Sequence, residues 1–163
     1  NQMKILVVSD THRKDDNLKL VLSEECPLDM LIHLGDAEGS EHFIPDWVNP
    51  ECRMEMVLGN NDFFSRLDRE REIDIAGHKA FITHGHYYGV SMGPEGLVDE
   101  AKSRGCDIAM YGHTHRPFLD VIDGVTVLNP GSLSYPRQEG RRPSYMIIHV
   151  DADGKMDYQQ KYL

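Results

Sequence analysis

The sequence predicts an α/β protein whose strands form two sheets. In the first half, short apolar runs alternate with helix-like segments in the order strand, helix, strand, helix, strand, which is typical of a parallel sheet. In the second half, three pairs of strand-like runs are joined by turn residues, which is typical of antiparallel hairpins. A length of 163 residues suits one domain with a core large enough to hold a pre-formed site.

The first half is expected to contain three strands and two helices. Strands are predicted where the apolar runs lie, and helices where the apolar residues recur at helical spacing. The elements are a strand at 4–8, a helix at 15–25, a strand at 30–34, a short helix at 40–48 and a strand at 53–58. The first helix is indicated by Leu18, Val21 and Leu22, which follow an Asp start signal.

The second half is expected to be richer in strands. A helix at 94–104 is indicated by Pro94 in its first turn and by Gly105 after its end. A buried strand follows at 108–111. The three hairpins pair 71–76 with 79–83 around Gly77-His78, 118–122 with 126–128 around Asp123-Gly124, and 144–150 with 155–162 around 151–154.

The charge balance excludes several classes of function. The chain has 17 Lys and Arg against 27 Asp and Glu, a formal charge of −10, which argues against a nucleic-acid polymer as partner and against a basic membrane anchor. No apolar run approaches the roughly 20 residues of a membrane span, and because the chain enters a strand-like run almost at once, we expect no signal peptide. Cys26, Cys52 and Cys106 are far apart and form no C-x-x-C pair, so we expect reduced thiols in the cytoplasm.

Polar clusters follow five of the predicted strands. They are Asp10-Thr11-His12, Gly35-Asp36, Gly59-Asn60-Asn61-Asp62, His84-Gly85-His86 and Gly112-His113-Thr114-His115. Because ligands of open α/β sheets bind at the carboxyl ends of the strands, these clusters are expected to meet at one edge. Residues two apart project to the same side of an extended chain, so both members of each D-x-H or H-x-H pair could reach one centre.

The residue types in these clusters indicate metal binding. Asp, Asn and His suit manganese, iron, zinc, nickel or cobalt. Seven plausible donors are too many for one tetrahedral ion, so two ions that share a bridging carboxylate fit better.

Several of these residues have simpler interpretations. Asp10 could cap the segment that follows it. His86 could orient His84, touch substrate or only pack. Asp62 could bond a ligand histidine from behind or close an Asx turn. One of Arg13, Arg116 and Arg137 could meet phosphate oxygens, or each could simply be solvated.

The five clusters in this order, followed by Asn129-Pro130-Gly131-Ser132 and Arg137, resemble the calcineurin-like metallophosphoesterase family. The resemblance is to its small bacterial and archaeal phosphodiesterases, and it extends from Asp10 to about Arg137. It implies a four-layer α/β/β/α sandwich with two mixed sheets between helices. It also implies a single metallophosphoesterase domain over residues 1–163 without a cap domain.

The resemblance also implies a role for each donor. Asp10, His12 and His115 would hold a first metal ion and Asn60, His84 and His113 a second, with Asp36 as the bridge. The cofactors would be two divalent ions, manganese foremost and nickel, zinc, iron or cobalt as alternatives. The implied reaction is hydrolysis of a phosphodiester by a hydroxide that bridges the two ions.

Asn61 and His86 are the expected catalytic contacts to substrate. Many members of the family have His where this chain has Asn61. An amide cannot donate a transferable proton, so Asn61 favours diesters with good leaving groups over phosphomonoesters. The expected partner is a small phosphodiester, with no membrane, and a homo-oligomer is left open. The alternatives are a phosphomonoesterase or a non-catalytic scaffold like the eukaryotic retromer subunit that resembles this fold.

Overall fold

The computed structural model describes residues 2–163, which form two five-stranded sheets. The first sheet has the order β10-β9-β1-β2-β3. Its strands are β1 (Met3–Val8), β2 (Met30–His33), β3 (Arg53–Met56), β9 (Ser144–Val150) and β10 (Met156–Tyr162). The strands β1, β2 and β3 are parallel, whereas β9 runs antiparallel to both β1 and β10.

The second sheet has the order β4-β5-β6-β8-β7. Its strands are β4 (Glu70–Ile75), β5 (His78–Thr83), β6 (Ile108–Met110), β7 (Pro117–Ile122) and β8 (Val125–Pro130). The central strands β5, β6 and β8 are parallel, and the edge strands β4 and β7 are antiparallel to their neighbours. Both sheets are therefore mixed.

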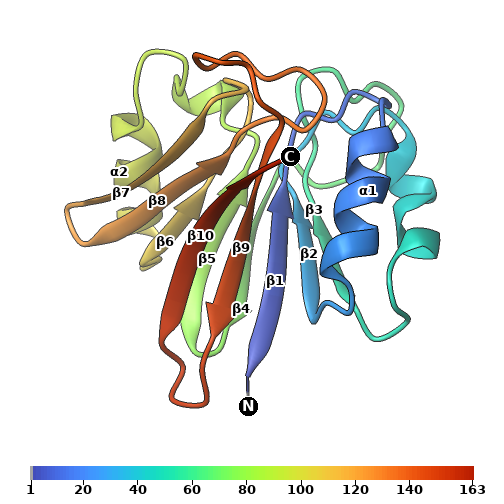
Figure 1. Cartoon of the computed structure of the whole chain (residues 1–163). Helices are drawn as coiled ribbons and strands as arrows, with labels where there is room; N and C mark the ends of the chain where they lie inside the picture. Colours follow the sequence, from blue (N-terminus) through green and yellow to red (C-terminus); the bar gives the residue numbers. More distant parts are fainter. Residues whose placement is uncertain (1) are drawn as a thin grey trace.

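The two sheets pack face to face and carry a helix on each outer face, as Figure 1 shows. Side chains of both sheets fill the layer between them, among them Ile32 of β2 and Ile82 of β5. Helix α1 (Asp16–Glu25) buries Leu18, Val21 and Leu22 against the first sheet. Helix α2 (Glu95–Ser103) buries Leu97, Val98 and Ala101 against the second. The predicted four-layer α/β/β/α sandwich is confirmed.

The segment at 40–48 differs from its prediction. Instead of one helix it forms two short 3₁₀ helices, Ser40–His42 and Ile44–Trp47. Pro45 stands in the first turn of the second one and lacks the N–H that a continuous helix would need at this point. A short 3₁₀ helix, His86–Tyr88, also follows β5.

The strands that precede the polar clusters all end at one edge of the molecule. This edge is the top in Figure 1, where the arrowheads of β1 and β2 point. The opposite edge carries the turns of the β4–β5 and β9–β10 hairpins. None of the helices formed by residues 2–163 combines the length and the apolar character needed to span a bilayer.

Candidate metal centre

Loops from both sheets bring the predicted donors together. Asp10 and His12 follow β1, Asp36 follows β2 and Asn60 follows β3, all in the first sheet. The histidines of the second sheet complete the set: His84 follows β5, and His113 and His115 follow β6. Neither sheet alone holds all the donors, so their arrangement depends on how the two sheets pack.

The backbone is left-handed at five of the seven predicted ligands. The φ angles are 55° at Asp10, 49° at His12, 62° at Asp36, 72° at His113 and 61° at His115. Residues other than glycine rarely adopt such angles. The expectation that extended chain brings residues two apart together is therefore wrong for the pair Asp10 and His12 and for the pair His113 and His115, because all four residues have left-handed backbone.

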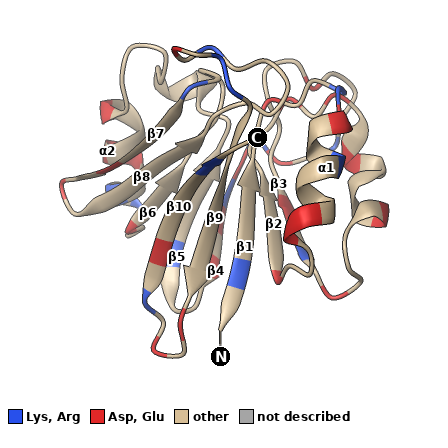
Figure 2. Cartoon of the chain, in the orientation of Figure 1, with Lys and Arg blue, Asp and Glu red and all other residues tan. Residues whose placement is uncertain are grey.

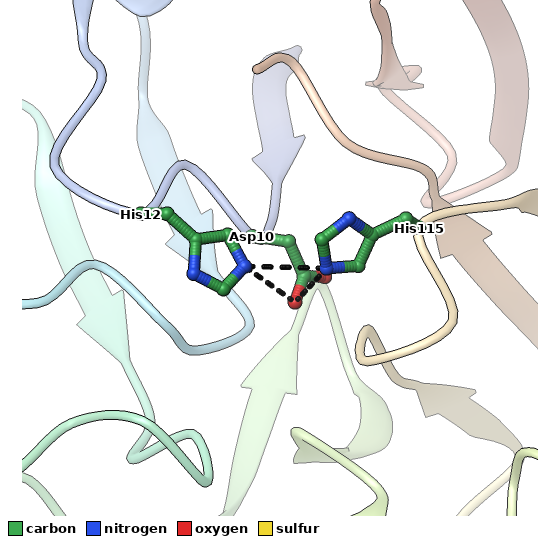
Figure 3. Close-up of side chains that lie close together, drawn as sticks. All are labelled: Asp10, His12 and His115. Atoms are coloured by element: carbon green, nitrogen blue, oxygen red, sulfur yellow. Dashed lines mark hydrogen bonds and ion pairs between the residues drawn. The ribbon is translucent and has the colours of Figure 1, made fainter. Parts of the chain in front are cut away.

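The first group of side chains is Asp10, His12 and His115 (Figure 3). Asp10 Oδ1 lies 3.3 Å from His115 Nε2 and 3.8 Å from His12 Nε2. The two Nε2 atoms lie 3.2 Å apart. Asp10 and His115 are buried, and His12 is half-buried.

The other nitrogen of each ring fixes its tautomer. His12 Nδ1 lies 2.7 Å from Glu38 Oε2, and His115 Nδ1 lies 2.7 Å from the carbonyl oxygen of Tyr135. Both partners are acceptors, so both Nδ1 atoms carry the proton and donate it. In the neutral rings, the two Nε2 lone pairs consequently face each other and the Asp10 carboxylate.

The second group is Asp10, Asp36 and His84. His84 Nε2 lies 3.3 Å from Asp36 Oδ2 and 3.6 Å from Asp10 Oδ1. His84 Nδ1 donates to the Leu34 carbonyl at 2.6 Å, so Nε2 is the lone-pair nitrogen when the ring is neutral. Asp36 Oδ2 also lies 3.7 Å from His12 Nε2, so this carboxylate stands between the two groups.

The donor set fits a divalent cation. Asp10 Oδ1 and His84 Nε2 are fully buried and have no hydrogen-bond partner among the described residues. Burying a polar atom without a partner costs free energy unless another group compensates it. Several electron-pair donors with few protons among them form a site that a positive charge would stabilise, and carboxylate oxygen with imidazole nitrogen suits the divalent transition metals.

Asn60 and His113 lie together beside these groups. His113 Nδ1 is 3.2 Å from Asn60 Oδ1, and the His113 and His84 ring centroids are 5.1 Å apart. Asn60 is exposed and His113 half-buried. This pair adds an amide oxygen and an imidazole nitrogen on the His84 side, whereas His115 lies on the His12 side.

Asn61 and His86 take different positions. Asn61 donates its backbone N–H to Asp36 Oδ1 at 2.8 Å and its side-chain Nδ2 to Asp36 Oδ2 at 3.2 Å. His86 lies with its ring centroid 5.4 Å from that of His84, and its buried Nδ1 has no hydrogen-bond partner among the described residues. Asn61 thus touches the carboxylate between the two groups, whereas His86 keeps an uncommitted nitrogen beside them.

The electrostatics of the site are dominated by burial and by the carboxylate–imidazole contacts. Burial alone would raise the pKa of Asp10 and of Asp36, but the attraction of the neighbouring His115 and His84 lowers both. Burial would lower the pKa of His84, yet Asp36 and Asp10 outweigh it and raise that pKa to about 9. A metal ion that binds His84 at neutral pH must therefore displace a proton.

Asp62 links the loop that follows β2 to the loop that follows β3. Its carboxylate accepts the backbone N–H groups of Asp36 at 2.8 Å, Glu38 at 2.7 Å and Gly59 at 2.7 Å. Neither of its two interpretations is found among the described residues, since no bond reaches a ligand histidine and none reaches the N–H of Phe64, which an Asx turn would use. The bonds to the Asp36 loop were not predicted.

Two glycines allow these loops to approach closely. A Cβ on Gly59 would lie 2.2 Å from Asp36 Oδ1, and one on Gly112 would lie 2.0 Å from Ser9 Oγ and 2.9 Å from Asp10 Oδ2. Ser9 Oγ donates to Asp10 Oδ2 at 2.7 Å, as does the backbone N–H of His113 at 3.0 Å. Because one oxygen of Asp10 is bonded in this way, the other is left to face the histidines.

Comparison with known proteins places this centre in a family. The model of the calcineurin-like phosphoesterase superfamily domain matches residues 3–153. The chain belongs to this superfamily. The family is one of metal-dependent phosphoesterases, and the candidate ligands lie within the matched residues.

Two curated relatives and one solved structure are similar over most of the chain. A probable metallophosphoesterase of Mycoplasma pneumoniae is 33% identical, over 90% of this chain and 89% of its own length. Phosphodiesterase MJ0936 of Methanocaldococcus jannaschii is 32% identical, over 79% of this chain and 83% of its own. The structure of vacuolar protein sorting 29 from Cryptosporidium parvum superposes with a TM-score of 0.77 at 18% identity, over 99% and 98% of the two chains, and shows the shared fold alone.

Proposed function

We propose that this chain is a phosphodiesterase that uses two divalent metal ions. The observation that carries the proposal is the buried, unpartnered pair of Asp10 Oδ1 and His84 Nε2, which face further lone pairs in a chain of the phosphoesterase superfamily. The curated relative named a phosphodiesterase supports a diester substrate. Asp10, His12 and His115 would hold one ion, and Asn60, His84 and His113 the other, with Asp36 between them.

The metal ions would act on the phosphate and on a bound water, and Asn61 and His86 would contact the substrate. Bound divalent ions would neutralise the charge of a phosphate and lower the pKa of a coordinated water to about 7. Asn61 lies against Asp36 and offers a neutral amide donor to a phosphate oxygen. Burial and the neighbouring His84 and His113 lower the pKa of His86, so a neutral ring with a free nitrogen would face substrate at neutral pH.

Replacement of the central carboxylate tests this proposal. Asp36→Asn removes the charge of the residue that stands between the two groups of ligands, so hydrolysis of bis(4-nitrophenyl) phosphate with added Mn²⁺ should fall at least about 100-fold, a loss of about 2.7 kcal/mol of transition-state stabilisation. Asp153→Asn changes an exposed acid and should leave the rate unchanged. Activity that survives Asp36→Asn would contradict the shared-carboxylate centre.

The same assay separates the alternatives. With 4-nitrophenyl phosphate as substrate, turnover should be slower than with the diester, because Asn61 cannot protonate the leaving group. Faster turnover of the monoester would favour a phosphomonoesterase. Absence of hydrolysis with manganese, nickel, zinc, iron and cobalt would favour a non-catalytic scaffold of the same fold.

A further inference from the structure

An open groove of about 830 Å³ begins at the candidate metal centre. His12 and His115 form part of its wall, so it opens directly onto the first group of ligands. The remaining lining residues are Glu38, Arg116, Tyr135, Pro136, Arg137 and Arg141. Most of them belong to the loop between β8 and β9, along which Figure 2 shows several basic stretches at the top of the molecule.

The three arginines of this groove are unpaired. Arg116, Arg137 and Arg141 are exposed, and among residues 2–163 no ion pair or side-chain hydrogen bond engages their guanidinium groups. Arginines elsewhere in the chain, such as Arg53 and Arg104, bond carboxylates. The whole chain has a formal charge of −10, but this groove holds three cations that no described carboxylate neutralises.

Only one carboxylate lines the same groove. It belongs to Glu38, which accepts the His12 Nδ1 proton at 2.7 Å. The groove thus has more positive than negative charge even before a metal ion is bound beside it. An anion that entered it would meet arginines whose planar fork matches phosphate oxygens.

The loop between β8 and β9, which carries Arg137 and Arg141, is tied to the metal centre. His115 donates its Nδ1 proton to the Tyr135 carbonyl at 2.7 Å, and the Arg137 N–H donates to the His115 carbonyl at 3.1 Å. Ser132 Oγ donates to the Asp10 carbonyl at 2.8 Å. These contacts fix the position of the groove relative to His115 and Asp10. A substrate that occupies both the groove and the metal centre would require such a fixed arrangement.

The size of the groove indicates a substrate larger than a simple diester. Pockets of about 300–1,000 Å³ hold whole small molecules, whereas the reacting phosphate itself would lie at the metal centre. We propose that the groove binds a second phosphate of the substrate, so that the preferred substrate is a phosphodiester that carries a further phosphate on one of its ester groups. This inference rests on the proposed function.

A matched pair of substrates tests the inference. They are the 4-nitrophenyl esters of thymidine 5′-phosphate, one with and one without a 3′-phosphate. The wild-type protein should show at least about a tenfold higher kcat/KM for the 3′-phosphorylated ester, mainly through a lower KM, because one charge-assisted interaction is worth about tenfold in affinity. Equal kcat/KM values for the two esters would overturn the inference and leave the proposed function standing.

Variants assign the preference to the groove. Arg137→Gln and Arg141→Gln should each lower the ratio of the two kcat/KM values at least threefold, and the double variant should bring it close to one. Arg142→Gln is the matched control, because Arg142 lies outside the lining residues and points to the Leu163 carbonyl and the Tyr162 ring. A ratio that the double variant leaves unchanged, or that Arg142→Gln lowers equally, would contradict the assignment.

A binding measurement without metal separates the two proposals. Inorganic phosphate titrated into the protein in EDTA should shift the backbone amide resonances of Tyr135 and of residues 137–141, and the double variant should bind at least fivefold more weakly. If the groove binds phosphate in this way but no ester is hydrolysed with any metal, the proposed function fails and the anion site remains. If these amides do not respond to phosphate in the wild-type protein, the groove is not an anion site.

Discussion

At the scale of single residues, five of the seven candidate ligands have strained backbone. A left-handed conformation at a residue other than glycine costs on the order of 1 kcal/mol or more and persists only where the surroundings enforce it. Around Asp36, that enforcement comes from Asp62 through its bonds to the amides of Asp36, Glu38 and Gly59. The stability of this site therefore depends on a residue that is not itself a predicted ligand.

Asp62→Asn should expose this dependence. The amide of Asn keeps one oxygen acceptor but replaces the other with a donor, which cannot accept the N–H bonds that Oδ2 receives. We expect a loss of about 1–3 kcal/mol in the free energy of unfolding, measured by urea denaturation. Asp68→Asn, at a side chain that is 71% exposed, should change stability by less than about 0.5 kcal/mol; an equal loss in both variants would refute the special role of Asp62.

The sequence predicted which side chains gather at the site, but not what orients them. Asp10, His84 and His115 could be predicted because each polar cluster directly follows an apolar strand, and the ends of such strands meet. The orientation of the two histidines depends on the carbonyl groups of Leu34 and Tyr135. Every residue has a carbonyl, so nothing in the sequence marks these two as acceptors.

At the scale of elements, a buried carboxylate ties α1 to three strands of the first sheet. Glu25, the last residue of α1, accepts hydrogen bonds from Lys161 of β10 at 2.7 Å and from Tyr145 of β9 at 2.9 Å. Lys4 of β1 lies 3.0 Å from its other oxygen. Burial would raise the pKa of Glu25, but the bonds from Lys161, Lys4 and Tyr145 outweigh it and lower that pKa to about 2.

This shift predicts a pH dependence of stability. A carboxylate with a lowered folded-state pKa stabilises the fold fully above its ordinary value of 4.5 and loses that contribution as the pH falls toward 2. Glu25→Gln should cost about 1–3 kcal/mol at pH 7, and its difference from the wild-type protein should shrink between pH 4.5 and pH 2. Glu24→Gln, at the exposed neighbour, should show no such difference; a gap between wild type and Glu25→Gln that is constant with pH would contradict the assignment.

The predicted elements agree with the structure where apolar spacing decides them. The strand at 30–34 and the helix at 94–104 each lie within one residue of the observed β2 and α2 at both ends, because continuous apolar runs and helical spacing specify them. The segment at 40–48 shows the limit of this reasoning. Ile44 has the apolar character expected of a short helix, but Pro45 beside it limits the backbone hydrogen bonds to short 3₁₀ turns.

At the scale of the whole molecule, metal binding should couple to stability. The candidate ligands come from loops of both sheets, so an ion that binds them binds the folded chain in preference to the unfolded one. An ion at 100 times its Kd should add about 2.7 kcal/mol and raise Tm by about 5–10 °C, as read by differential scanning calorimetry with Mn²⁺. EDTA should reverse the shift and Asp36→Asn should reduce it; identical melting curves with and without each divalent metal would argue against the centre.

The pattern of apolar residues could not predict which strands belong to which sheet. Apolar spacing predicts a hairpin at 144–162, but it does not show that this hairpin joins β1 rather than the neighbouring strands of the second sheet. The pairing is decided by packing, since Ile148 of β9 lies opposite Ile5 of β1 and both are buried between the sheets. The four layers were therefore predicted from the family resemblance and not from the spacing.

The position of β1 between β2 and β9 has a consequence for synthesis on the ribosome. All seven candidate ligands precede β9 in the chain, so they leave the ribosome while β1 still has an open edge. Until β9 and β10 emerge and pair, the first sheet lacks two of its five strands, and Glu25 lacks its partners Tyr145 and Lys161. A nascent chain of this protein would thus carry every candidate metal donor before it has the sheet that holds them in place.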